Sequence, residues 1–120
     1  MLFDVQRTTV AGRPALTVRG ELDIATAPQL AEAAEALLAG SPAALVVDLT
    51  PTEFLDSSGA RSLFRLARRA ADEGVAFHVV APRSNRPIRL PIDLMELDSV
   101  MPIVNSAGEL PAAAVGREGT

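Results

Sequence analysis

The chain has 120 residues, no cysteine, one histidine and a formal net charge of −4. A chain of this length is expected to fold as one domain, and the lack of cysteine excludes disulfides, thiolate metal sites and cysteine nucleophiles. The acidic balance disfavours binding along nucleic-acid phosphates, and four Phe without Trp or Tyr provide no platform for stacked bases. We therefore expect the partner to be another protein.

Neither a signal peptide nor a membrane span is predicted. Residues 1–10 lack the basic start and apolar core of a signal peptide, and no window approaches the roughly 20 apolar residues of a transmembrane helix. His78 lies in the apolar run 75–80 and is interpreted as a buried strand residue, because one histidine cannot build a multi-histidine metal site. These features predict a cytoplasmic protein without a cofactor.

Two strands are predicted first, over residues 3–10 and 13–19. Ala11 and Gly12 between them are typical of a short hairpin connection. Apolar and polar residues alternate in the second strand, which predicts that one of its faces is buried.

A helix follows, with Thr26 and Gln29 predicted to form a capping box and Pro28 to lie in the first turn. Gly40 and Pro42 are predicted to end it. One apolar stripe is predicted to face the core, and it consists of Leu30, Ala33, Ala34, Leu37 and Leu38.

Two further strands and a second helix complete the regular part. The apolar runs 44–49 and 75–81 are predicted to be interior strands, and the helix between them ends at Gly74. Its predicted core side carries Leu63, Leu66, Ala67, Ala70 and Ala71. This order of elements predicts right-handed crossovers. We expect an α/β domain with a mixed central sheet of four to five strands and helices packed against it.

The last third is less regular. We predict, in order, a loop, a short helix, an edge strand and a frayed terminal helix over residues 81–91, 91–100, 101–104 and 106–115. Pro91 is placed in the first turn of the short helix. The domain is expected to span 1–115, with 116–120 as a flexible tail.

Catalysis is not expected. The common hydrolase, nucleotide-binding and zinc-protease motifs do not occur. Ser57 has no evident base, because His78 is predicted to lie in a strand. Asp23, Glu53 and Asp56 could form a carboxylate pair for glycoside chemistry, but aromatic sugar platforms are missing.

The most informative stretch is residues 54–70, FLDSSGARSLFRLARRA, in which an apolar run breaks at Asp-Ser-Ser-Gly before a helical pattern begins. The simpler interpretation is structural, because Asp and Ser are preferred N-caps. One cap suffices, however, and three polar residues are present. A serine at a helix N-terminus, such as Ser57, lies over unpaired amides where a phosphate is held at low cost. Arg61, four residues later, is predicted to lie on the same side and to screen the added charge.

Four carboxylates are predicted to lie near this end of the sheet: Glu21, Asp23, Glu53 and Asp56. Phosphorylation would add about −1.5 to −2 charges to an acidic patch. A docked partner would then meet like charges, whereas the fold itself could tolerate the phosphate. The pattern therefore favours a phosphorylation switch.

Three segments carry a family resemblance: GELD (20–23), VVDLTPTEFLDSSGARSLFRL (46–66) and LDSVMPI (97–103). Over residues 3 to about 115 the chain resembles the STAS-domain anti-sigma factor antagonists of bacteria, proteins that regulate transcription. The resemblance implies that Ser57 accepts phosphate from a cognate anti-sigma factor with serine-kinase activity, which brings its own ATP. It also implies that the unphosphorylated form binds this kinase and frees a sigma factor, and that a serine phosphatase resets the cycle.

The predicted partner-binding residues surround this motif: Glu21, Asp23, Asp56, Ser57, Ser58, Gly59, Arg61 and Arg65. Two positions depart from the family pattern. Glu96 replaces a frequent glycine before Leu97-Asp98, and Pro91 falls where the family usually continues a helix.

Several alternatives remain open from the sequence. Asp23 could brace its own turn, and Ser58 could turn its hydroxyl inward. The arginines Arg61, Arg65, Arg68 and Arg69 could form a solvated helix face or a surface for an acidic partner. Two other functions are also retained. One is a STAS scaffold or accessory subunit of a transporter or stress complex without a phosphate cycle. The other is a small-ligand sensor, for which no Gly-rich phosphate cradle is present.

Overall fold

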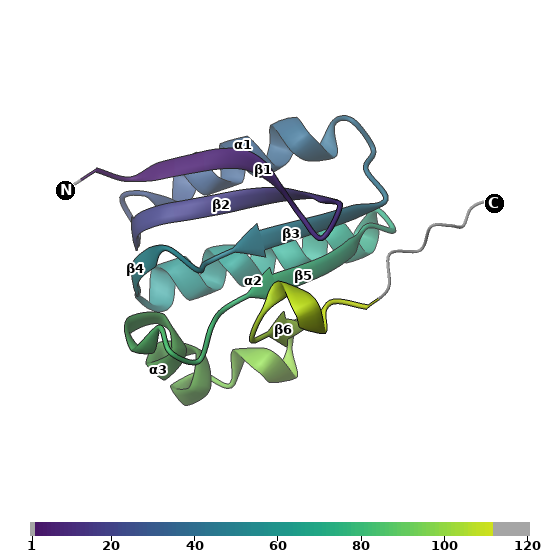
Figure 1. Ribbon diagram of the computed structural model, residues 1–120. Helices are drawn as coiled ribbons and strands as arrows, with labels where there is room; N and C mark the ends of the chain where they lie inside the picture. The colour runs from purple at the N-terminus through teal and green to yellow at the C-terminus, as the bar shows by residue number, and fades with distance from the viewer. Residues whose placement is uncertain (1, 112–120) are drawn as a thin grey trace.

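A six-stranded mixed sheet forms the centre of the computed structural model, which describes residues 2–111 (Figure 1). The path across the sheet is β1 (Asp4–Val10), β2 (Arg13–Leu22), β3 (Ala44–Asp48), β5 (Ala76–Val80) and β6 (Ile103–Val104). β1 is antiparallel to β2, and the remaining pairs are parallel. The predicted mixed α/β architecture is confirmed.

The sixth strand, β4 (Thr52–Leu55), was not predicted. It pairs in parallel with the end of β2, beyond the stretch of β2 that pairs with β3. Its burial does not alternate, because Thr52 and Leu55 are buried while the two residues between them are exposed. The Thr52 hydroxyl donates to the carbonyl of Val18 at 2.7 Å, which ties the start of β4 to β2.

Helices α1 (Ala27–Leu38) and α2 (Ser57–Asp72) cover one face of the sheet, the rear face in Figure 1. Each presents an apolar stripe to the main core, and the fully buried side chains include Leu30, Leu37 and Leu63. Ala71 was predicted to belong to the α2 stripe but is exposed. No helix among residues 2–111 is long and apolar enough to cross a membrane.

Helix α3 (Arg86–Leu94) begins five residues before the predicted helix, and Pro91 lies inside it rather than in its first turn. The side-chain amide of Asn85 donates to the carbonyl of Thr52 at 2.7 Å and so anchors the start of α3 beside β4. Ile88 and Ile92 are completely buried in the main core. Tertiary packing therefore outweighs the backbone hydrogen bond that a proline cannot donate.

The predicted helix at 91–100 is replaced after Leu94 by a turn and a 3₁₀ helix, Leu97–Ser99. The edge strand predicted at 101–104 is present as β6. Of the terminal helix predicted at 106–115, the structure describes residues 106–111, and these contain a 3₁₀ helix, Ala107–Glu109. Residues 112–120, which include the predicted domain boundary and tail, lie outside the described residues.

The second face of the sheet carries a small apolar cluster of its own. Ala15, Val46 and Val80 are buried there, and Leu110 of the C-terminal segment packs against them. The guanidinium of Arg13 is buried and donates to the carbonyl oxygen of Pro111. The yellow segment in front of the sheet in Figure 1 is therefore held by both an apolar and a polar contact.

His78 occupies the same face, because it is two residues before Val80 in β5. It is half-buried, and its Nδ1 atom has no hydrogen-bond partner among the described residues. Desolvation lowers the pKa of His78 below its ordinary value of 6.5, and the nearby Arg13 guanidinium lowers it further.

Acidification should therefore destabilise the fold through His78. The unfolded chain recovers the ordinary pKa and binds the proton more readily, so the stability present above pH 6.5 is lost as pH falls below it. We expect the free energy of unfolding, measured by urea denaturation, to fall between about pH 7 and pH 5.5, above the range where carboxylates titrate. His78→Phe should flatten this slope, and an unchanged slope in that variant would contradict the assignment.

Candidate functional site

The site lies where β2 and β4 end side by side and α2 begins. Glu21 is paired with Phe54, and Leu22 with Leu55. The amide of Asp56 then donates to the Leu22 carbonyl oxygen at 3.3 Å, which extends the pairing to the first residue of the motif. The two strands thus carry the side chains that precede α2 to one edge of the sheet.

Four carboxylates lie at this edge, as the sequence predicted: Glu21 and Glu53 lie within β2 and β4, and Asp23 and Asp56 follow directly after these strands. Glu21 and Glu53 are exposed, while Asp23 and Asp56 are half-buried. Among the described residues, none of the four forms an ion pair. The edge is therefore an uncompensated acidic surface.

Asp56 is the N-cap of α2. Its backbone is extended (φ −104°, ψ −174°), and its Oδ1 accepts a hydrogen bond from the amide of Gly59 at 2.8 Å. The structural interpretation of the motif is therefore satisfied by Asp56 alone. The hydroxyls of Ser57 and Ser58 form no hydrogen bond within the described part of the chain. Ser57 is exposed, and Ser58 is half-buried on the side of α2 that faces α1.

Gly59 has a packing role. A Cβ atom built at this position would lie 2.3 Å from the carbonyl oxygen of Leu22 and 2.8 Å from Cδ1 of Leu55. The first turn of α2 can approach the end of β2 this closely only because residue 59 has no side chain. Gly59 is accordingly buried, and it differs in this from the other predicted partner-binding residues, which are exposed or half-buried.

Asp23 braces the turn between β2 and α1, one of the two roles that the sequence left open. Its Oδ1 accepts from the amides of Ala25 at 3.0 Å and Thr26 at 3.1 Å. The Thr26 hydroxyl accepts from the Asp23 amide and donates to the carbonyl of Glu21, at 2.9 and 2.7 Å. The predicted capping box is therefore wrong, because the Thr26 side chain bonds back into the turn and does not cap α1.

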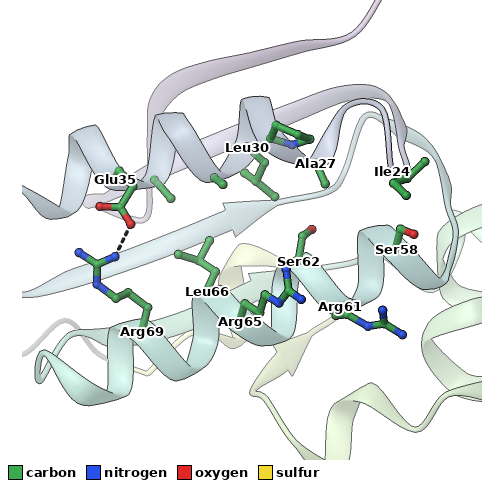
Figure 2. A pocket seen from close by; sticks show the side chains of 13 residues that line it. Ile24, Ala27, Leu30, Glu35, Ser58, Arg61, Ser62, Arg65, Leu66 and Arg69 are labelled. Carbon is green, nitrogen blue, oxygen red and sulfur yellow. Dashed lines mark hydrogen bonds and ion pairs between the residues drawn. The ribbon is translucent and has the colours of Figure 1, made fainter.

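A groove of about 730 Å³ runs between α1 and α2 (Figure 2). Its α1 side is mostly apolar and includes Ala27 and Leu30, with Ile24 at the end nearest Ser58. Its α2 side carries Arg61, Arg65 and Arg69. Arg69 bridges the two helices through an ion pair with Glu35 of α1, and it also pairs with Glu73.

The structure brings most of the predicted site residues to one end of the molecule, around the start of α2. Arg61 and Arg65 extend the set along α2 and line the groove. The α1 side of this groove was not predicted. Ile24, 75% exposed, is the one residue there that the sequence could have indicated, because it is a large apolar side chain in a polar turn, outside the apolar stripe of α1.

Comparison with known proteins places the chain in a family. A family model described as "Mlab, STAS domain" matches residues 5–103. The anti-sigma-F factor antagonist RsfB of Mycobacterium tuberculosis (strain CDC 1551 / Oshkosh) is 41% identical over 87 residues, which cover 72% of this chain and 69% of that protein. The chain belongs to the STAS-domain anti-sigma factor antagonist family.

Solved structures agree with this assignment. The crystal structure of an anti-sigma factor antagonist from Mycobacterium paratuberculosis superposes on this STAS domain with a TM-score of 0.77. The two are 35% identical, and the match covers 88% of this chain and 87% of that one. The unphosphorylated form of the anti-sigma factor antagonist SpoIIAA has a TM-score of 0.61 over 90% of this chain and 92% of its own, and at 18% identity it shows the shared fold alone.

The two departures from the family pattern now have a structural setting. Glu96 adopts a left-handed backbone, with φ 52° and ψ 43°, where a glycine would be free of strain. Pro91 lies within α3, whose buried isoleucines hold the helix in place. Both residues belong to the C-terminal third of the chain, where α3 packs against β4, the strand that leads into α2 (Figure 1).

Proposed function

We propose that this STAS domain is an anti-sigma factor antagonist controlled by phosphorylation of Ser57. The unphosphorylated form binds a cognate anti-sigma factor that has serine-kinase activity, and this binding frees a sigma factor. The kinase binds ATP and transfers the γ-phosphoryl group of ATP to the Ser57 oxygen, which loses its hydroxyl proton, and ADP leaves. A serine phosphatase then restores the binding form.

One observation carries the proposal: the Ser57 hydroxyl is exposed at the first position of α2, while Asp56 already serves as the cap. The hydroxyl is therefore accessible to an enzyme and is not needed for the start of the helix. A phosphate there would meet unpaired amides and the positive end of the helix dipole, which stabilise an anion. The fold should tolerate the modification.

The same phosphate should weaken partner binding. It would add about −1.5 to −2 charges next to the carboxylates of Glu21 and Asp56. A partner surface that fits the unmodified acidic edge would have to desolvate this phosphate and would meet an altered charge pattern. The name of the 41% identical relative, an anti-sigma-F factor antagonist, supports the same class of partner.

Phosphorylation itself can be tested with purified proteins. The chain is incubated with ATP and its cognate anti-sigma factor, and its peptides are analysed by mass spectrometry. We expect one phosphate on Ser57, no phosphate on Ser57→Ala, and unchanged modification of Ser58→Ala. Modification of Ser58 instead of Ser57 would contradict the proposal. A chain that stays unmodified under conditions that allow complete phosphorylation would also contradict it and would favour a scaffold without a phosphate cycle.

A further inference from the structure

The groove between α1 and α2 combines two kinds of chemistry. The α1 side and the floor are apolar, formed by Leu30, Ala31 and Ala34 of α1 and Leu66 of α2. Ile24, at one end, leaves 75% of its surface exposed. The opposite side is cationic. An occupant that buries the apolar part must therefore also satisfy a row of arginines.

The cationic row follows one ridge of α2, because Arg61, Arg65 and Arg69 are spaced by four residues. Arg69 is already neutralised by Glu73 and Glu35, and the hydrogen bonds that its guanidinium donates to these two carboxylates raise its pKa. Arg61 and Arg65 are exposed and have no ion-pair partner among the described residues. A chain with a formal charge of −4 thus presents two adjacent unpaired cations beside an apolar channel.

The dimensions fit a helix. From Ser58 to Arg69 the groove follows 12 residues of α2, which span roughly 17 Å or about three helical turns. Carboxylates placed four residues apart on an incoming helix repeat at the same spacing as Arg61 and Arg65. Leucines on the adjacent face of that helix would cover Leu30 and Ala31 and reach Ile24. A small anion, in contrast, would satisfy the arginines and leave the apolar channel uncovered.

We propose that the α1–α2 groove is a docking surface for an acidic amphipathic helix of a partner protein. Its apolar face would cover the groove floor, and its carboxylates would pair with Arg61 and Arg65. This inference extends the proposed function, since both arginines belong to the predicted partner-binding residues, but it requires neither a kinase nor a phosphate. A binding test with the isolated chain therefore separates the two proposals.

The probe is a capped synthetic helix of about 16 residues with leucines spaced by three and four and glutamates in i, i+4 pairs. A matched peptide has glutamine in place of each glutamate. We expect the glutamate peptide to shift the backbone amide NMR signals of residues that line the groove, with Ala31 and Leu66 among them. Fluorescence anisotropy should show that the glutamine peptide binds at least about fivefold more weakly.

Protein variants locate the contact. Arg61→Glu/Arg65→Glu should weaken binding of the glutamate peptide by about tenfold or more, because two attractions become repulsions. Ala31→Glu, on the opposite side of the groove, should weaken it as well. Arg68→Glu is the control for each single reversal, Arg61→Glu or Arg65→Glu: it makes the same charge change on α2, but Arg68 lies over the Phe64 ring and does not line the groove. Its affinity should stay within about twofold of the wild type.

Four outcomes would overturn the inference. The first two are NMR signal shifts outside the groove and an equal loss of peptide affinity in Arg68→Glu. The third is a dimer in sedimentation velocity that Arg65→Glu dissociates. The fourth is binding of the laurate anion that shifts the NMR signals of the same groove residues as expected for the peptide. The last two would assign the groove to a second copy or to a fatty acid. If the peptide binds while Ser57→Asp leaves kinase affinity unchanged, the groove stands and the phosphorylation switch fails. If the peptide does not bind while Ser57→Asp lowers the affinity for the kinase, only the groove proposal is rejected.

Discussion

Ser57→Asp and Ser57→Glu are expected to lower the affinity of the chain for its cognate anti-sigma factor by at least about tenfold, while Ser57→Ala keeps wild-type affinity and cannot be phosphorylated. Either acidic side chain places a fixed negative charge at the start of α2, where Asp56 and Glu21 already lie close by. Isothermal titration calorimetry with purified proteins measures this difference directly. The loss of binding free energy should exceed any change in the free energy of unfolding, because Ser57 is exposed and is not the cap.

Ser41→Asp is the matched control for charge. Ser41 is exposed and precedes β3, so it lies at the opposite end of the parallel strands from the acidic edge. Its backbone is left-handed, with φ 52°, a conformation that aspartate tolerates. Affinity should not change in this variant. Equal affinity of the wild type, Ser57→Ala and Ser57→Asp would reject the switch and favour the scaffold function. A similar loss in Ser41→Asp would indicate a general charge effect.

The elements that the sequence predicted well are those with a strong local pattern. The stripe of α1 repeats every three or four residues, and its leucines are buried as expected. The mixed sheet followed from the order of apolar runs, and the motif at 56–59 followed from helix-capping chemistry. Local patterns therefore sufficed to locate Ser57 and the cluster of carboxylates.

The missed features depend on contacts between distant segments. β4 shows no alternation, and the Thr52 hydroxyl that anchors it bonds to β2. The start of α3 is held by Asn85, whose side-chain amide donates to the carbonyls of Leu49, Thr50 and Thr52, just before and at the start of β4. Such bonds leave no periodic trace in the sequence, so residues 86–90 resembled a proline-rich loop. The groove was missed for the same reason, because it exists only after α1 and α2 pack side by side.

Gly59→Ala is expected to lower the free energy of unfolding by about 2 kcal/mol, in the range found for overpacked cores. In an open helix the same change would stabilise the protein by up to about 1 kcal/mol, because alanine is the better helix former. Here the new methyl group would lie 2.3 Å from the Leu22 carbonyl oxygen, so the backbone of β2 or α2 must shift. Urea denaturation followed by circular dichroism measures both the sign and the size of the change.

Gly40→Ala provides the comparison, because its added Cβ would lie 3.5 Å from the Leu37 carbonyl oxygen, an ordinary contact. It should leave stability within about 0.5 kcal/mol of the wild type. The shift that Gly59→Ala forces would also displace Ser57, two residues earlier, so its phosphorylation should slow more than stability alone explains. A neutral or stabilising Gly59→Ala would mean that α2 can move away from β2 freely. The inference that packing of α2 against β2 holds the Ser57 hydroxyl in a fixed position, on which the switch depends, would then be wrong.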